Sequence, residues 1–295
     1  MPKGDAARRR VRTHRTAVLA TCLAGVVCLS GASCQSLRRP IDDFAHLPPA
    51  LPPTPTLDQV IQAVNGNCSQ IRTVWAPQAS ISGPGFPTLQ ATVAYERPLR
   101  LRVRAGTGIL GEELDLGSND ELFWFWARRG QPPALYFCRH AQFASSPARQ
   151  TLPVDPYWLM EAFGVAEIDP TLSHQGPFAR QDGRLEIRTL RPGPDGNSTK
   201  ITVLDRTHAL VLEQHVFDSR NQLLASAIAS QHRRDPLSGL SMPTVIDIRL
   251  PPQRTTLRVS LGNVQINRPL GNPERLWAMP VGEGRMPVDL CNGNF

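Results

Sequence analysis

Charged residues are scarce in this chain, and its excess of positive charge is confined to one end. Of the 295 residues, 19% are charged and the formal net charge is +7. Six bases and one acid lie within residues 1–33, which leaves 26 bases against 24 acids in residues 34–295. This near-neutral remainder gives no indication of nucleic-acid binding. The 41% of hydrophobic residues excludes wholesale disorder.

Motifs of nucleophilic and metal chemistry are also missing. The sequence has no Gly-x-Ser-x-Gly elbow. His208 and His215 lie an odd number of residues apart in a strand pattern and so on opposite faces. Glu213 and His215 share a face, as a metal pair or a cross-strand surface pair would. We therefore predict no enzyme, no cofactor and no metal site, although an enzyme of unrecognised type remains an alternative.

One motif resembles a dinucleotide fingerprint but has the wrong surroundings. Gly106-Thr-Gly-Ile-Leu-Gly111 follows a predicted strand, yet the residues after it reach the turn signal Gly117-Ser-Asn-Asp120 too soon to form a helix. A phosphate-binding motif of this kind must open a helix. We predict a hairpin loop instead, with the apolar pair Ile109-Leu110 set between glycines.

The first 33 residues have the pattern of an export signal. Basic residues precede an apolar run of about 14 residues, Thr16–Leu29, shorter than the roughly 20 of a transmembrane helix. Gly31-Ala-Ser-Cys34 resembles a bacterial lipobox, although Gly31 stands where leucine is usual. We predict a signal peptide over 1–33 and lipidation of Cys34, with ordinary cleavage into the periplasm as the alternative. Gln35 favours the outer membrane over the inner one.

Prolines are concentrated after Cys34. Six of the 28 prolines lie between residues 40 and 55, where they enforce extended backbone that cannot build a core. We predict a tether over 34–55, long enough to span roughly 60 Å at about 3.1 Å per residue. It is either the spacer of an anchored lipoprotein or a segment without particular use. One folded domain follows over 56–295.

Apolar periodicity predicts helices at two places and strands elsewhere. Apolar residues over 57–71 recur at helical spacing after Thr56, a suitable N-cap. A second helix begins at Asp155-Pro156 and ends at Gly164. Leu99–Arg104 alternates leucine or valine with arginine, as expected for a strand with one wet face. The other predicted strands include 122–126, 135–138, 185–190, 201–204, 210–217, 222–230, 244–250 and 256–266. Ten or eleven strands without strand–helix alternation predict a mainly β (α+β) fold with one curved antiparallel sheet.

An aromatic cluster, Phe123-Trp124-Phe125-Trp126, makes both faces of one strand apolar. An antiparallel sheet normally leaves one face in water, so another element must cover the second face. The helices around 57–71 and 158–163 are the candidates. If they do not fill the sheet, an apolar cavity remains; a simply packed core is the alternative. The residues predicted to line the cavity or its lid are Phe123, Trp124, Phe125, Trp126, Trp158, Leu159 and Phe163.

The order of these features resembles the LolA/LolB superfamily of periplasmic lipoprotein carriers and outer-membrane receptors. The resemblance spans roughly residues 56–280 and includes Tyr95-Glu-Arg-Pro-Leu-Arg-Leu-Arg-Val103 and Gly111-Glu-Glu-Leu-Asp-Leu-Gly-Ser-Asn119. It implies an unclosed β-barrel with helices as a lid over a cavity for acyl chains. In LolB-like receptors an exposed leucine on an early hairpin loop touches the membrane. Leu110, beside Ile109, is similar in place and kind, unless one of the pair turns back into the sheet.

These observations together predict a cell-envelope lipoprotein that binds acyl chains of lipoproteins or other lipids and takes part in their transfer or outer-membrane insertion. Its partners would be lipids, the membrane and a periplasmic lipoprotein carrier. A scaffolding envelope protein with a solid core is the alternative. We also predict a disulfide between Cys68 and Cys291, because both lie beside segments that need restraint, whereas Cys138 lies inside an apolar strand.

Overall fold

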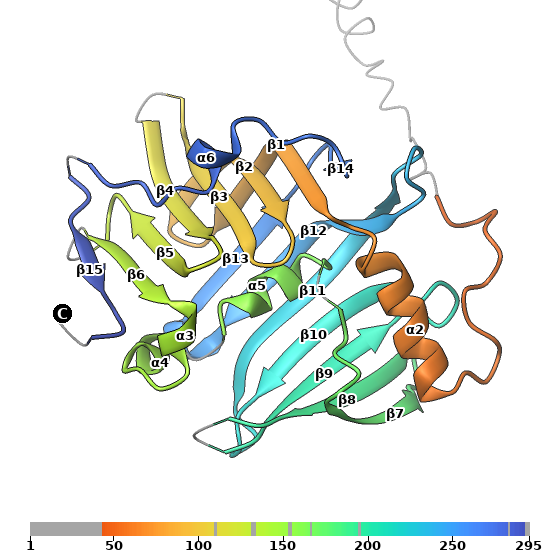
Figure 1. The fold of residues 1–295 in the computed structure, drawn as a ribbon. Helices are drawn as coiled ribbons and strands as arrows, with labels where there is room; N and C mark the ends of the chain where they lie inside the picture. The colour runs from red at the N-terminus through yellow and green to blue at the C-terminus, as the bar shows by residue number, and fades with distance from the viewer. Residues whose placement is uncertain are drawn as a thin grey trace, which may run out of the picture. The chain divides into compact units, whose positions relative to one another are not determined.

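One curved, unclosed sheet dominates the structure (Figure 1). The computed structural model describes residues 43–108, 111–130, 134–152, 155–165, 167–193, 196–282 and 284–292. The strands in this part of the chain are β1 (Thr73–Gly83), β2 (Phe86–Glu96), β3 (Arg100–Thr107), β4 (Gly111–Ser118), β5 (Leu122–Ala127), β6 (Leu135–Arg139), β7 (Ser173–Ala179), β8 (Leu185–Arg191), β9 (Ser198–Leu204), β10 (Val211–Phe217), β11 (Leu223–Arg234), β12 (Ser241–Leu250), β13 (Thr255–Ser260), β14 (Gln265–Ile266) and β15 (Pro287–Asp289).

The strand order is β15-β6-β5-β4-β3-β2-β1-β13-β12-β11-β10-β9-β8-β7, with β14 beside β1. Neighbouring strands are antiparallel. The exception is β15, which runs parallel to β6 at one edge. The predicted curved antiparallel sheet is confirmed. The described strands exceed the predicted number, and three of them, β7, β14 and β15, are short or poor in apolar residues, so that alternation does not reveal them.

Helices in the described ranges are few and short. They are α2 (Leu57–Cys68), α3 (His140–Phe143), α4 (Ala148–Thr151), α5 (Tyr157–Ala162), α6 (Pro273–Leu276) and the 3₁₀ turn η1 (Pro251–Gln253). None of the helices in the described part of the chain is long and apolar enough to cross a membrane.

The helix α2 begins where its N-cap predicts. The Thr56 hydroxyl accepts a hydrogen bond from the Gln59 amide, and the Gln59 side chain accepts one from the Thr56 amide, which completes a capping box. Its buried face, which includes Val60 and Val64, packs with Ile187 of β8 in one apolar cluster. This end of the concave face is therefore covered by α2 (Figure 1).

The second predicted helix is α5, which lies in the middle of the concave face (Figure 1). The Asp155 carboxylate accepts a hydrogen bond from the Tyr157 amide at its start, and Gly164 adopts a φ of +77° just beyond its end. Trp158, Met160 and Phe163 are buried in the main apolar cluster with both halves of the sheet. The helix thus joins the two halves of the curved sheet.

The glycine motif forms a β-hairpin, as predicted. Gly106 pairs with Glu112 and Thr107 with Gly111 across β3 and β4. A Cβ on Gly106 would lie 2.2 Å from the Gly111 carbonyl oxygen, so the close approach of the two strands requires glycine here. Ile109 and Leu110, which come between β3 and β4 in the sequence, lie outside the described residues, and so does Cys34.

The prediction that the arginine face of β3 is exposed to water is wrong at one position. Arg100 and Arg104 are partly exposed, but Arg102 between them is buried. The reason is the chain after β14, which crosses this convex face and excludes water from it. The Arg102 guanidinium donates to the carbonyl oxygens of Leu276 and Ala278 in that segment, at 2.9 and 2.8 Å.

Candidate functional site

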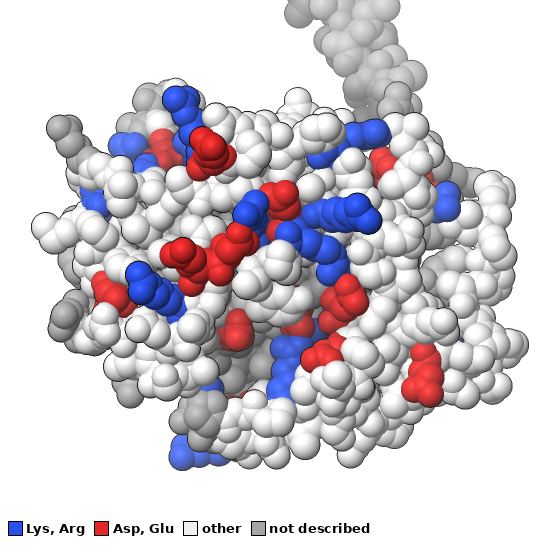
Figure 2. Space-filling model, in the orientation of Figure 1, with Lys and Arg blue, Asp and Glu red and all other residues white. Residues whose placement is uncertain are grey.

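A cavity with a volume of about 880 Å³ lies between α5 and the concave side of β8–β11. Figure 2 shows acidic and basic side chains around a hollow on this face. The apolar part of its wall includes Phe143, Trp158, Leu172, Val216 and Leu224. The charged residues of the wall are Arg149, Asp155, Glu161, Glu167, Asp169, Arg191, Asp218 and Arg220. The lining therefore combines apolar and charged side chains, whereas the sequence predicted an apolar one.

A buried ionic cluster contributes two of its three residues, Glu161 and Arg191, to the lining of this cavity. Glu161 projects from α5, and its carboxylate contacts Arg191 at the end of β8. Its other oxygen lies 2.9 Å from the Lys200 ammonium of β9. The Gln214 side-chain amide donates to the Glu161 carbonyl oxygen, which ties α5 to β10. The cluster holds two cations and one anion, so its formal charge is +1.

Burial and charge act in opposite directions on this cluster. Burial raises the pKa of Glu161, but Lys200 and Arg191 outweigh it and hold that pKa below its ordinary value. Burial lowers the pKa of Lys200, which Glu161 opposes. The carboxylate therefore stays ionised at neutral pH and holds Arg191 at the cavity wall, while Lys200, its other partner, does not line the cavity.

Of the seven side chains predicted to line the cavity, Trp158 does so. Leu159 and Phe163 pack against the main apolar cluster beneath α5. Phe123 lies in a separate cluster with Phe143, and Phe125 is exposed. The sequence pattern shows which side chains of a strand share a face, but it does not show which distant segment lies opposite that face. The residues that line the cavity could therefore not be predicted from it.

Trp124 and Trp126 point away from the cavity, and the helices do not cover them. They form a small convex cluster with Leu135, against which Met279 packs. The Trp124 indole N–H donates to the Asp115 carboxylate at 3.1 Å, and that carboxylate accepts two hydrogen bonds from Arg102, at 3.1 and 2.7 Å. The second face of the aromatic strand is thus covered by the C-terminal segment.

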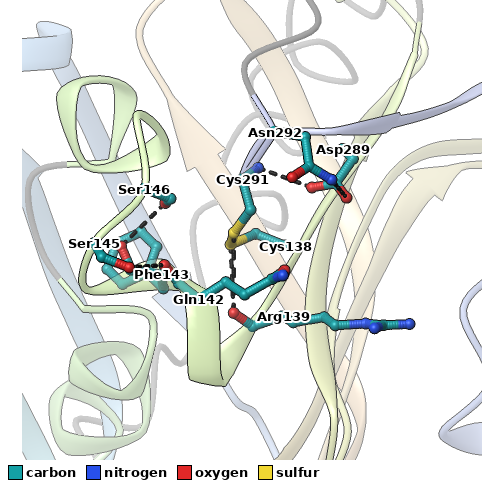
Figure 3. Close-up of a disulfide and its surroundings, with 9 residues drawn as sticks. All are labelled: Cys138, Arg139, Gln142, Phe143, Ser145, Ser146, Asp289, Cys291 and Asn292. Carbon is teal, nitrogen blue, oxygen red and sulfur yellow. Dashed lines mark hydrogen bonds between the residues drawn. A yellow bond between two sulfur atoms is a disulfide. The ribbon is translucent and has the colours of Figure 1, made fainter.

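The predicted disulfide between Cys68 and Cys291 is wrong. Cys138 of β6 is bonded to Cys291, with a Cα–Cα distance of 5.3 Å (Figure 3). The parallel pairing of β15 with β6 brings the C-terminal segment to Cys138. Cys68 is a buried free thiol at the end of α2, 3.4 Å from the Gly164 carbonyl oxygen, and burial raises its pKa to about 11.

One serine–histidine pair has the contacts to be considered for nucleophilic chemistry. The Ser118 hydroxyl lies 3.2 Å from His140 Nε2, but the same nitrogen lies 3.0 Å from the Asn119 carbonyl oxygen. A carbonyl oxygen can only accept, so in the tautomer that satisfies this contact Nε2 donates to it and is not a base for the serine. Within the described ranges no three His, Cys, Asp or Glu side chains gather in a way that could hold a metal ion.

The second half of the predicted tether is not free, because from Asp43 onward the chain lies on the domain. Leu51 is buried with α2, and the Ala50 amide donates to the Thr207 carbonyl oxygen at 2.8 Å. The Arg206 guanidinium donates to the Pro53 carbonyl oxygen at 2.5 Å. The tether prediction now applies to residues 34–42, which lie outside the described part.

Comparison with known structures identifies the fold. An outer membrane lipoprotein-sorting protein domain from Vibrio parahaemolyticus has a similar structure, with a TM-score of 0.52 and 9% sequence identity. The match covers 75% of this chain and 97% of the Vibrio chain. A DUF1329 family protein from Desulfovibrio piger (11% identity, 74% and 96% covered) and a LolA superfamily protein from Nitrosomonas europaea (13%, 74% and 97%) match with lower TM-scores of 0.48 and 0.44. No family model and no curated protein matches the sequence. The chain has a LolA-like fold, and the resemblance is confirmed at that level.

Proposed function

We propose that this chain is a cell-envelope lipoprotein, anchored through Cys34 and facing the periplasm from the outer membrane, that binds acyl chains of lipoproteins or other lipids. The observation that supports it best is the cavity of about 880 Å³ between α5 and the concave side of a LolA-like sheet. This volume lies in the range of small-molecule sites, about 300–1,000 Å³. Binding would need no covalent chemistry, since each methylene moved out of water contributes about 0.8 kcal/mol.

The mixed lining indicates an amphiphile rather than a bare hydrocarbon. Trp158, Val216 and Leu224 offer an apolar wall for the chain, while Arg191 and Arg220 lie in the same cavity. A ligand with an acyl chain and a polar or anionic head would satisfy both parts. The exposed apolar side chain of Phe125, on β5, adds apolar surface outside this cavity.

Native mass spectrometry of the protein purified from its envelope tests this proposal. We expect wild-type protein to retain a lipid, and Val216→Trp and Leu224→Trp, which fill the cavity, to lose it. Leu190→Trp is the matched control, because Leu190 is exposed and does not line the cavity. Wild-type protein that emerges without lipid, or cavity-filled variants that retain as much as wild type, would contradict the proposal.

A scaffolding role is favoured by one observation. The side chains of Met160, Ala162 and Phe163 are buried against the sheet in the main apolar cluster. If this packing is the purpose of α5, the envelope protein should carry no lipid at all. The same mass measurement therefore separates the two functions.

The proposed membrane contact at Ile109 and Leu110 has its own test. If Leu110 projects into a bilayer, Leu110→Glu should leave the melting temperature unchanged while membrane association or lipid transfer falls. If the side chain packs back on the sheet, the same change should lower the melting temperature by several degrees. Unchanged transfer by a stably folded Leu110→Glu protein would refute the contact.

A further inference from the structure

The turn between β11 and β12 presents an apolar side chain to water. Leu237 is 74% exposed, the highest value among the large hydrophobic residues of the described chain. The turn itself is well ordered by hydrogen bonds: the Asp235 carboxylate accepts from the Ser238 amide at 2.7 Å and from its hydroxyl at 2.6 Å, and the Gly239 amide donates to the Asp235 carbonyl oxygen. Leu237 is therefore held outward by a defined turn, at a cost of about 1.5–3 kcal/mol relative to burial.

Arginines surround this turn. Arg233, Arg234 and Arg268 line a surface hollow of about 420 Å³ together with Asp235. The Asp235 carboxylate is occupied by Ser238, and Arg268 lowers the pKa of that carboxyl group in addition. Three guanidinium groups lie here beside two carboxylates, Asp235 and the Asp43 that pairs with Arg233, and the remaining charge of +1 makes this end of the molecule suited to phosphate groups.

The chain that leads to the predicted anchor starts from the same place. The Asp43 carboxylate lies 3.4 Å from the Arg233 guanidinium and accepts a hydrogen bond from the Arg234 amide at 3.2 Å. Only nine residue steps separate Cys34 from Asp43, which span at most about 30 Å. A lipid on Cys34 would keep the β11–β12 turn within that distance of the membrane. This distance to the membrane depends on the proposed lipid anchor at Cys34.

We propose that the β11–β12 turn is a membrane-contact surface, in which Leu237 enters the bilayer interface and Arg233, Arg234 and Arg268 face the phosphates of anionic lipids. Apolar tips flanked by cations bind such interfaces through buried area and charge together. The register of the sheet places the β3–β4 loop at the strand ends shared with η1, and the β11–β12 turn at the opposite strand ends. The two contacts are therefore separate surfaces with separate tests.

The experiment uses full-length exported protein with a solvent-sensitive fluorophore on Leu237→Cys, mixed with vesicles of phosphatidylethanolamine and phosphatidylglycerol. Buried Cys68 is shielded from labelling in the folded protein. The matched control is Val281→Cys, whose parent side chain is 67% exposed on the C-terminal segment. Flotation of the vesicles reports the anchor, and the emission of the label reports the contact. We expect floated protein to show a blue shift at position 237 and none at 281.

A second pair of variants tests the arginines. Arg234→Glu combined with Arg268→Glu should reduce the blue shift at position 237, whereas Arg249→Glu, at an exposed position near the other end of β12, should leave it unchanged. Protein that floats with both labels in water would refute the contact while leaving the anchor intact. Protein that does not float would refute the anchor, and this proposal with it. Neither outcome bears on lipid binding in the cavity, which native mass spectrometry tests separately.

Discussion

The buried cluster of Glu161, Arg191 and Lys200 allows a sharp prediction about stability. The Glu161 side chain is 2% exposed and that of Lys200 7% exposed. Glu161→Gln keeps the volume but removes the charge, which leaves the Lys200 ammonium buried without an anion. Breaking a buried pair in this way costs about 3–5 kcal/mol. For a chain of this size a loss of 1 kcal/mol lowers the melting temperature by about 2–4 °C, so a fall of roughly 6–20 °C is expected.

Urea unfolding followed by tryptophan fluorescence measures this loss. Glu121→Gln is the matched control, because Glu121 is exposed and its carboxylate should contribute little. The double variant Glu161→Leu with Lys200→Met should recover most of the stability, since apolar replacement of both partners is often neutral or better. A loss below about 1 kcal/mol in Glu161→Gln would refute the reasoning, because it would mean that Lys200 reaches water or another anion.

The same cluster predicts a dependence on pH. Lys200 and Arg191 hold the folded-state pKa of Glu161 below its ordinary value of 4.5, although burial raises it. The folded protein therefore releases this proton more readily than the unfolded chain does. The contribution of Glu161 is fully present above pH 4.5 and is lost as the pH falls through the lower, folded-state pKa. The stability difference between wild type and Glu161→Gln should narrow as the pH is lowered from 7 to 3, and a constant difference would contradict this.

Three further predictions concern the convex face and the cysteines. Arg102→Gln should lower the free energy of unfolding by about 3 kcal/mol or more, because it leaves the buried Asp115 carboxylate poorly compensated. Arg104→Gln on the same strand should lower it by less than about 1 kcal/mol, since the Arg104 side chain is 55% exposed and that of Arg102 only 8%. Equal losses in urea unfolding would contradict the burial of Arg102. Reducing the Cys138–Cys291 disulfide, which joins residues 153 apart, should lower stability by about 2–5 kcal/mol, and peptide mapping that recovers Cys291 linked to Cys68 would refute the pairing. The Cys68 thiol, whose burial raises its pKa to about 11, should resist alkylation at neutral pH until the protein is unfolded; rapid labelling of the folded protein would count against its burial.

Local features of this fold could be predicted from the sequence because the signals for them lie close together in the chain. Thr56 and Gln59 form the cap of α2, three residues apart. Gly164 ends α5 because a positive φ favours glycine at that position. The glycines that flank the β3–β4 tip allow two strands to approach closely. Alternation of apolar and polar residues likewise located most strands, and with them the curved antiparallel sheet.

What the sequence could not determine is which distant segment lies on which face of that sheet. Nothing near Arg102 in the chain shows that residues 276–278 cover it, so an alternating strand predicted an exposed arginine where the structure has a buried one. The pairing of β15 with β6 decided which cysteine bonds to Cys291. The buried ionic cluster beside the cavity has the same origin, because Glu161, Arg191 and Lys200 come from one helix and two strands. Side-chain periodicity records how each strand divides its own residues between two faces. The environment of each face depends on contacts between residues far apart in sequence, and these exist only in the folded chain.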